Sequence, residues 1–183
     1  MKKIIIISSS IREGRLGHRV SLFLKNYLID NSIADAEIID LNEYKFPLFE
    51  ERLFNMPNPP ANLLNFVNRF KNSDGVIIAS SVYNYSFPAS LKNAIDVMYP
   101  EWKRKVVALS SATMGFVEGV PTTFQLENTL SQMGAFVSPI KYFAINISKV
   151  FNEDGSPVDK EKEEKKIKPM IDEFMFLIGK LTD

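Results

Sequence analysis

Three loops of this chain carry residue types that could hold a small ligand, and the first of them suits an anion. The segment 8–20, SSSIREGRLGHRV, places three serines, two glycines and three arginines between an apolar run and an amphipathic stretch. Serine hydroxyls and loop amides donate hydrogen bonds, a helix N-terminus adds partial positive charge, and an arginine can bind two phosphate oxygens at once. We therefore predict a phosphate cradle. A helix cap with solvated arginines is the alternative.

This first loop does not match the spacing of two common nucleotide-binding motifs. Neither G-x-G-x-x-G nor G-x-x-x-x-G-K-[ST] occurs in it, which argues against that kind of dinucleotide site and against a nucleoside triphosphatase. A phosphate monoester fits the loop better. His18, the single histidine, is expected to be a surface residue or a minor loop contact rather than a catalyst.

The second loop, 80–88, suits a planar ring. Tyr83, Asn84 and Tyr85 follow one another just before Ser86 and an amphipathic stretch. Aromatic walls give stacking area, while an asparagine and loop amides can form hydrogen bonds with the edge of a ring. The alternative is that the two tyrosines are half-buried packing residues and that Ser86 only caps a helix.

The third loop, 110–121, is SSATMGFVEGVP and joins an apolar run to another amphipathic stretch. Its small residues and two glycines could bring backbone close to a ligand. A linker that touches no ligand is an equal alternative for this segment.

These loops belong to a regular alternation of strands and helices. Apolar runs predict five strands, and stripes with i, i+3, i+4 spacing predict the helices between them. The strands are expected at 2–9, 36–41, 75–80, 105–112 and 139–146. They are apolar throughout rather than alternating, which predicts a parallel sheet covered on both faces, a three-layer α/β sandwich. In such a sheet ligands bind beyond the carboxyl ends of the strands.

The remaining segments are expected to complete a single domain over 1–183. Residues 42–60 carry four prolines and are predicted to form a long ordered surface loop. A last amphipathic helix is expected after Asp159, with Pro169 either kinking it or starting it. The sequence has no internal repeat and no composition shift that would indicate a domain boundary.

The composition excludes several classes of function. Twenty-two basic and 22 acidic residues give no broad field that would hold nucleic acid. The chain has no cysteine, so thiolate chemistry and zinc clusters are excluded, no metal site is predicted, and redox chemistry would need an organic cofactor. The N-terminal apolar run is too short for a signal peptide, and no run approaches the ~20 residues of a membrane span. A cytoplasmic location without a membrane partner is expected.

Two of the loops resemble motifs of the NADPH-dependent FMN reductase family of flavodoxin-like quinone, azo-dye and chromate reductases. The family's phosphate loop is similar to G-S-T-R-x-G-R-x-G, and residues 9–17 match it in register with Ser9 in place of the first glycine. A second family motif resembles P-E-Y-N-x-S-x-P-x-x-L-K-N-A-I-D, and the segment 83–96 matches it at the same spacing. Ser81 and Val82 replace the usual Pro and Glu of that motif.

The resemblance implies a flavodoxin-like five-stranded sheet of order 2-1-3-4-5, with FMN across the tips of strands one, three and four. It places the phosphate on Ser10, Arg12, Arg15, Leu16, Gly17 and His18. It places the flavin ring on Val82, Tyr83, Asn84, Tyr85 and Ser86, with help from Thr113 and Gly115. In the third loop Glu118 stands where a glycine is usual, so contacts to the pyrimidine edge of the ring are expected to differ there.

The activity that the resemblance implies is a flavin-dependent reduction. NADPH or NADH would pass a hydride to N5 of the flavin, and a quinone or a similar small acceptor would then enter the same pocket. No catalytic side chain is required, and we predict none. The alternatives are a flavodoxin-like electron carrier, which the balanced charge disfavours, and a non-catalytic FMN-binding module.

A homodimer, or a homotetramer built from two dimers, is the expected assembly. Met98, Tyr99 and Trp102 are large residues at and after the helix predicted over 88–98, and an exposed apolar patch usually marks an association surface. Members of the family are commonly dimers with sites near the subunit boundary. The alternative is that Trp102 packs in the core of its own chain.

Overall fold

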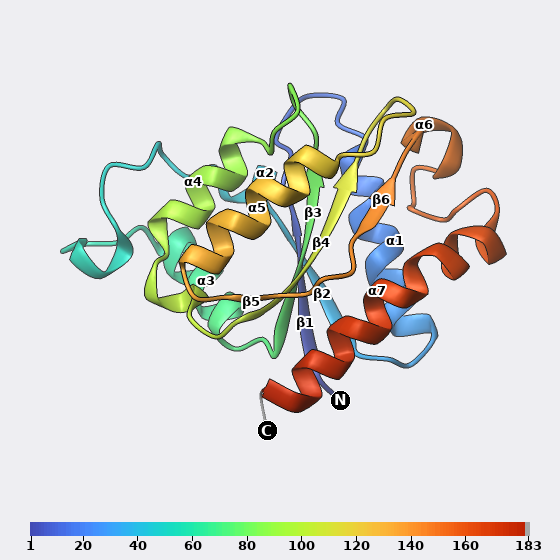
Figure 1. The fold of residues 1–183 in the computed structure, drawn as a ribbon. Helices are drawn as coiled ribbons and strands as arrows, with labels where there is room; N and C mark the ends of the chain where they lie inside the picture. Colours follow the sequence, from blue (N-terminus) through green and yellow to red (C-terminus); the bar gives the residue numbers. More distant parts are fainter. Residues whose placement is uncertain (182–183) are drawn as a thin grey trace.

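The computed structural model describes residues 1–181, whose strands form one parallel sheet between two layers of helices (Figure 1). The strands are β1 Lys3–Ser8, β2 Asp35–Asp40, β3 Gly75–Ser81, β4 Val106–Ala112, β5 Phe136–Val137 and β6 Tyr142–Ala144. Their order is β2-β1-β3-β4-β5, with β6 also paired to β4, and every pair is parallel. The predicted three-layer sandwich and the flavodoxin-like strand order are confirmed.

The fifth position of the sheet is occupied by two short strands. β5 pairs with the start of β4, and β6 pairs with its end. Pro139 lies between them and has no N–H to donate to the ladder, so the pairing is interrupted there. The bounds predicted for this strand, 139–146, are therefore wrong: pairing begins at Phe136 and ends at Ala144.

The longer helices correspond to the predicted amphipathic segments. They are α1 Gly17–Asp30, α3 Ala61–Lys71, α4 Ala89–Val97, α5 Val120–Gln132 and α7 Lys160–Leu181. Short helical pieces are α2 Leu41–Tyr44, α6 Ile147–Val150 and the 3-10 turns η1 Leu53–Asn55 and η2 Pro100–Trp102. Figure 1 shows α3, α4 and α5 on one face of the sheet and α1 and α7 on the other.

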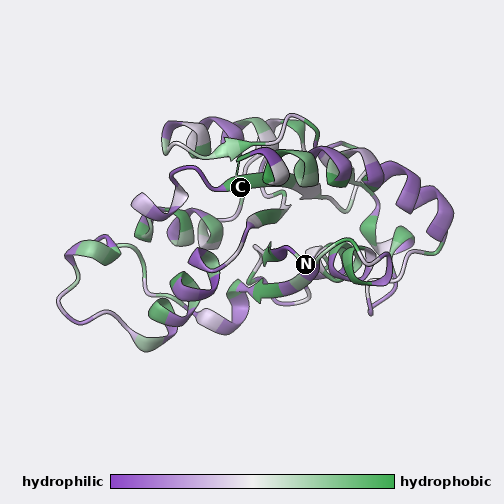
Figure 2. Ribbon diagram, turned by 90° about the horizontal axis from the view of Figure 1, so that it is seen from below, coloured by the Kyte–Doolittle hydropathy of each residue, from purple (hydrophilic) through white to green (hydrophobic). Residues whose placement is uncertain are grey.

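The strands are apolar throughout because both faces of the sheet are covered. In β1, Ile4 and Ile6 belong to the core cluster shared with α1 and α7, whereas Ile5 and Ile7 belong to the cluster shared with α3, α4 and α5. All four are at most 1 % exposed. Figure 2 shows hydrophilic and hydrophobic residues alternating along the helices, as in helices that bury one side.

Helix α7 runs from Lys160 through Pro169, so this proline does not start the helix. Near its beginning Glu163 is only 3 % exposed, and its carboxylate accepts a hydrogen bond of 2.7 Å from the Tyr142 hydroxyl of β6. Lys166 lies against the other oxygen of the same carboxylate. The buried charge is therefore partnered and joins α7 to the sheet. Within residues 1–181, no helix is long and apolar enough to cross a membrane.

Segment 42–60 contains the end of α2 and the turn η1, and is otherwise irregular. The Asn93 side chain of α4 fastens its middle: Oδ1 accepts from the Phe49 N–H at 2.6 Å, and Nδ2 donates to the Pro47 carbonyl at 2.7 Å. An asparagine in the matched second motif thus has a structural use in holding this loop against α4.

Trp102 packs in the core of its own chain. It is fully buried, its ring meets that of Phe70 edge to face at 4.6 Å between centroids, and its Nε1–H donates to the Ile95 carbonyl. Met98 is also fully buried, whereas Tyr99 is 45 % exposed. The expectation that some of these three residues stay uncovered is met by Tyr99, whereas Met98 and Trp102 lie in the core cluster and add nothing to an exposed patch. For Trp102 the alternative of packing in its own core is confirmed.

Candidate functional site

A cavity of about 580 Å³ opens at the carboxyl ends of β3 and β4 and is lined by all three predicted loops. The predicted site residues on its wall are Arg12, Arg15, Leu16, Gly17, Val82, Tyr83, Asn84, Tyr85, Thr113 and Gly115. Ser10, His18 and Ser86 do not line it. Because the loops leave neighbouring strands at the same edge of a parallel sheet, segments about a hundred residues apart in sequence meet at one place.

Several wall residues are not among the predicted site residues. Ser81 and Ala112 are the last residues of β3 and β4, so the rule that ligands bind at the carboxyl ends of strands could have found them. Ile147, the first residue of α6, also lines the cavity, but no motif or spacing in the sequence indicated it. The remaining wall residues are Gly14, Met114, Val117, Glu118, Gly119 and Pro121.

Helix α1 begins in the wall of this cavity with unsatisfied amides. Its N-cap residue, Leu16, gives no side-chain cap, and the first turn contains no acidic residue. In the described part of the chain, no acceptor bonds the N–H groups of Leu16, Gly17 and His18. Free N–H groups at the positive end of a helix dipole form a binding site for an anion.

Two glycines allow close backbone packing around the cavity. A Cβ on Gly17 would lie 2.3 Å from the Ser81 Oγ, so the start of α1 rests directly on the end of β3. A Cβ on Gly119 would lie 2.6 Å from both the Cβ of Ser111 and a methyl group of Val82. The third loop is therefore packed against β4 and against the second loop at a distance that no other residue permits.

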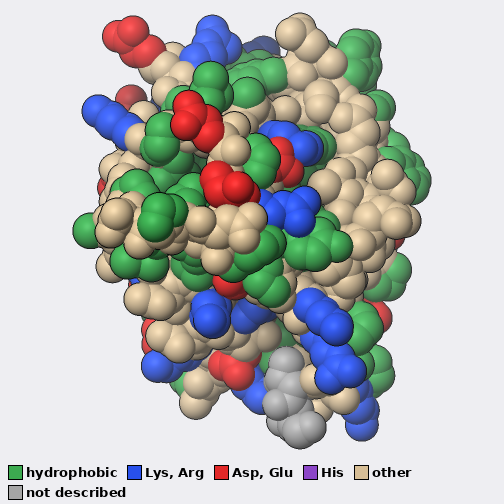
Figure 3. All heavy atoms as spheres, turned by 90° about the vertical axis from the view of Figure 1, so that its left-hand side faces the viewer, with side chains coloured by type: hydrophobic (Ala, Val, Ile, Leu, Met, Phe, Trp, Pro, Cys, Tyr) green, Lys and Arg blue, Asp and Glu red, His purple; other side chains and the backbone are tan. Residues whose placement is uncertain are grey.

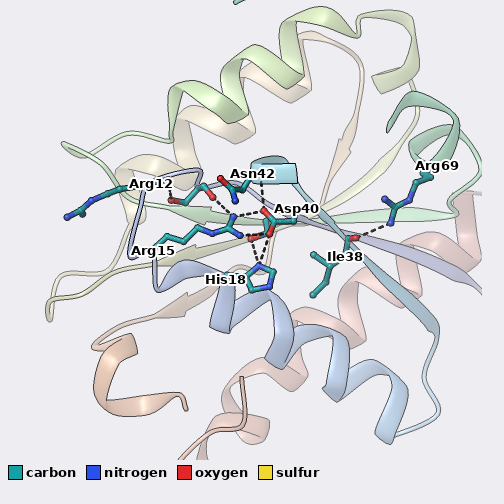
Figure 4. Close-up of polar contacts among 9 residues, drawn as sticks. Arg12, Arg15, His18, Ile38, Asp40, Asn42 and Arg69 are labelled. Carbon is teal, nitrogen blue, oxygen red and sulfur yellow. Dashed lines mark hydrogen bonds and ion pairs between the residues drawn. The ribbon is translucent and has the colours of Figure 1, made fainter. Parts of the chain in front are cut away.

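Arg12 and Arg15, two of the three arginines of the first loop, have different surroundings (Figure 4). The Arg15 guanidinium donates to both carboxylate oxygens of Asp40, the last residue of β2, and also to the Ser10 carbonyl. Arg12 is exposed and points away from this pair, and within residues 1–181 its guanidinium has no bonded partner. Because Asp40 compensates the charge of Arg15, Arg12 is, of these two arginines, the one that remains available to an anion.

Asp40 and His18 lie together beneath the loop. Burial acts to raise the pKa of Asp40, but the hydrogen bonds from Arg15 and from the Asn42 N–H outweigh it, so the pKa is lowered. Burial lowers the pKa of His18, although the charge of Asp40 opposes this effect. The His18 Nδ1 is hydrogen-bonded to the Ser8 Oγ at 3.0 Å and lies 3.6 Å from Asp40. His18 is therefore neutral near pH 7. Its ring contacts Ser8 and Asp40 and does not line the cavity.

Residues 83–86 form a tight turn at the other side of the cavity. The Tyr83 N–H donates to the Ser86 carbonyl and the Ser86 N–H donates to the Tyr83 carbonyl, both at 2.9 Å. Asn84 and Tyr85 between them have φ angles of 50° and 63°, the left-handed conformation that a two-residue turn of type I′ needs at both positions. Asparagine adopts this conformation readily, whereas a tyrosine there is strained.

Ser10 and Ser86 fasten the loops instead of lining the cavity. The Ser10 hydroxyl, buried at 1 % exposure, is hydrogen-bonded to the Tyr83 hydroxyl and accepts from the Arg12 N–H at 3.3 Å. The Ser86 hydroxyl donates to Oε1 of Gln125 on α5 at 2.6 Å. The first loop is therefore joined to the turn 83–86, and the turn is joined to α5. Within residues 1–181, no group of three or more His, Asp or Glu side chains could hold a metal ion.

Comparison with known proteins agrees with this arrangement. The profile of the NADPH-dependent FMN reductase family matches residues 2–149. The chain is 28 % identical over 117 residues to the NAD(P)H-dependent FMN reductase of Saccharomyces cerevisiae, a match that covers 56 % of this chain and 61 % of that protein. It is 27 % identical over 141 residues to the quinone reductase of Escherichia coli, covering 74 % of this chain and 72 % of that protein.

A solved structure resembles the chain over its whole length. The flavoenzyme NAD(P)H:(acceptor) oxidoreductase FerB from Paracoccus denitrificans superimposes with a TM-score of 0.81 at 25 % identity, covering 99 % of both chains. The family profile covers most of this chain, and the loops that resemble motifs of the family line the cavity. The protein therefore belongs to the NADPH-dependent FMN reductase family.

Proposed function

We propose that the protein binds one FMN per chain in the cavity and uses NADPH or NADH to reduce quinones or similar small acceptors. The observation that carries this proposal is the uncapped N-terminus of α1 in the wall of a cavity whose other side is a tyrosine-bearing turn. One cavity thus offers an anion-binding end and a ring-binding end, which suits a phosphate monoester attached to a planar ring system. The oxidoreductase activity of the family and the names of the relatives support the same reaction.

The residues that line the cavity fit FMN, and no ion pair has to break to admit its phosphate. The N–H groups of Leu16, Gly17 and His18 and the free guanidinium of Arg12 would hold the phosphate. The ring would lie against Val82, Tyr83, Asn84, Tyr85, Thr113 and Gly115. Ser10 and Arg15 would act by fastening the phosphate loop, and Ser86 by fastening the turn.

Bound FMN would supply the redox chemistry, a hydride accepted at N5 from NAD(P)H and two electrons passed to the acceptor. The proposed reaction then requires no acid or base from the protein itself. What this chain contributes is binding, orientation of the ring by the turn, and compensation of the phosphate charge by α1 and Arg12.

The proposal is tested by the visible absorption spectrum of the purified protein, by the mass of the released cofactor, and by NADPH consumption under air. We expect a flavin spectrum, the mass of FMN, and continuous oxidation of NADPH. An electron carrier would need an added reductase, and a binding module would show the spectrum without turnover. A protein that neither contains FMN nor binds it when it is added would overturn the proposal.

Steady-state kinetics should follow a ping-pong pattern. The three loops surround one cavity of about 580 Å³, so NAD(P)H and a quinone would compete for the same exposed face of the bound ring and bind in turn. Varying NADPH at several quinone concentrations should give parallel double-reciprocal lines. Intersecting lines, together with a ternary complex detected by a dead-end analogue, would contradict a shared pocket.

We also propose a homodimer, or a homotetramer built from two such dimers, with α4 and the loop 46–56 at the interface. Figure 3 shows hydrophobic side chains on this side of the molecule. Leu48, Phe54 and Tyr99 are 83 %, 59 % and 45 % exposed, and the Arg52 guanidinium lies 4.4 Å from the centre of the Tyr99 ring. An exposed apolar patch of this kind is typical of an association surface.

Sedimentation at micromolar concentration should give at least twice the chain mass of 20.8 kDa. Leu48→Glu should shift the protein to monomers, because it places a charge on the most exposed residue of this patch without touching the core. Val158→Glu, a change at another exposed apolar residue on a different part of the chain, is the control and should leave the mass unchanged. A wild-type monomer that carries FMN and oxidises NADPH at full rate would exclude this assembly.

A further inference from the structure

Gln125 lies outside the cavity wall, on the exposed side of α5, yet it bonds the turn 83–86 twice. Its Oε1 accepts from the Ser86 hydroxyl at 2.6 Å, and its Nε2 donates to the Tyr85 carbonyl at 3.2 Å. Gln125 lies 39 residues after Ser86 and 40 residues after Tyr85 in the sequence. These two bonds connect the turn to α5, the helix that begins at the end of the third loop.

The turn needs such support because its conformation is costly. Asn84 and Tyr85 are both left-handed; asparagine adopts this conformation readily, but in tyrosine the Cβ crowds the following carbonyl and the backbone is strained. The paired backbone bonds between Tyr83 and Ser86 close the turn and set the plane of the Tyr85–Ser86 peptide, but they do not hold the turn against the rest of the protein. The two bonds from Gln125 fasten this peptide and the Ser86 side chain to α5.

The chemistry of the contact requires an amide rather than a carboxylate. The Tyr85 carbonyl can only accept a hydrogen bond, so the atom of residue 125 that faces it must be a donor. The Ser86 hydroxyl donates to the other atom, which must be an acceptor. Glutamine supplies both in one planar group. A glutamate would satisfy Ser86 but would place an oxygen against the Tyr85 oxygen.

We propose that Gln125 is a positioning residue that holds the turn 83–86 in the conformation that binds the ring of the cofactor. This inference rests on the proposed function. Gln125 does not touch the cavity itself, so it acts through the turn: its two bonds hold the turn against α5, and the place of the turn determines where the side chains of Asn84 and Tyr85 lie on the wall. Arg12 and the start of α1 act at the other end of the cavity, and the two ends are separable by experiment.

The first test measures the turn without a ligand. Gln125→Leu should speed backbone hydrogen exchange at the Tyr83 and Ser86 amides several-fold, because these amides are protected by the turn that Gln125 supports. Gln132→Leu is the matched control, since Gln132 is an exposed glutamine of the same helix about 10 Å further along. It should leave both amides unchanged. Equal exchange in Gln125→Leu and wild type would overturn the proposal.

The second test compares FMN with riboflavin, which has the same ring but no phosphate. Gln125→Leu should weaken both ligands by the same factor, about five- to tenfold for the loss of two hydrogen bonds, and Gln125→Glu should weaken them at least as much. Arg12→Ala should weaken FMN alone. Because Gln125 is exposed, the thermal midpoint of the ligand-free protein should stay within a few degrees of wild type in all variants.

The outcomes separate this inference from the function on which it rests. A wild-type protein that binds neither FMN nor riboflavin overturns the proposed function. A wild-type protein that binds both, with Gln125→Leu binding riboflavin equally well, overturns the positioning role and leaves the function standing. Weaker riboflavin binding with faster exchange at Tyr83 and Ser86 supports both.

Discussion

Arg12→Ala is expected to weaken FMN binding roughly ten- to a hundredfold, because a hydrogen bond between charged groups contributes about 1.5–3 kcal/mol. The guanidinium has no bonded partner within residues 1–181, so the substitution removes a ligand contact without breaking a contact inside the described protein. The dissociation constant is measured by quenching of flavin fluorescence at fixed salt concentration. The difference between variant and wild type should shrink as salt rises, since an exposed ionic contact is screened.

The control is Arg104→Ala, which removes an exposed arginine just before β4, at the opposite end of the sheet from the cavity. It should bind FMN as wild type does. Arg15→Ala should act differently from Arg12→Ala, because it leaves the Asp40 carboxylate without its main partner and should therefore lower thermal stability as well as affinity. If Arg12→Ala binds FMN with wild-type affinity, the phosphate does not lie at this loop.

Gly119→Ala is expected to destabilise the protein by about 1–3 kcal/mol and to weaken FMN binding as well. The added Cβ would lie 2.6 Å from the Cβ of Ser111, which is part of the central strand β4 and can move only with its backbone. The start of α5 must shift instead, and with it the third loop and the contact to Val82 in the second loop. Thermal unfolding with and without FMN measures both effects, and the midpoint should fall by roughly 2–12 °C.

The matched control is Gly179→Ala, the same change at an exposed position of α7 where a Cβ meets no atom within 4 Å. Alanine favours a helix by about 1 kcal/mol over glycine, so this variant should be slightly more stable than wild type and should bind FMN normally. If the thermal midpoint falls in Gly119→Ala and rises in Gly179→Ala, the loss of stability in Gly119→Ala is due to the packing around the cavity. A Gly119→Ala protein with wild-type stability and affinity would show that the third loop can move freely.

The sequence by itself determined the layers of the fold. Runs such as the four isoleucines Ile4–Ile7 can only be satisfied between two covering layers, and amphipathic stripes between such runs supply those layers. It also placed the candidate site at three loops, because glycine, serine and aromatic residues that follow apolar strands stand at the edge where the ends of neighbouring strands meet. The strand order came from the matched motifs, and the structure confirms it.

The sequence could not determine the role of each polar residue within these loops. Arg12 and Arg15 are the same residue type three positions apart, and only Asp40, at the end of β2, decides between them: Arg15 forms an ion pair with it, and the Arg12 guanidinium has no bonded partner within residues 1–181. The sequence also cannot show that the hydroxyls of Ser10 and Ser86 bond Tyr83 and Gln125.

Long-range packing decided the remaining differences. Trp102 has no local feature that distinguishes an exposed aromatic ring from a buried one, and its place against Phe70 depends on how α3 meets the turn η2. Gln125 has no motif around it that would indicate its two bonds to a turn about 40 residues earlier. Periodicity records which side of an element is buried, because burial depends on spacing along that element. The partner that a polar group finds depends on distances between elements, and only the folded chain fixes those distances.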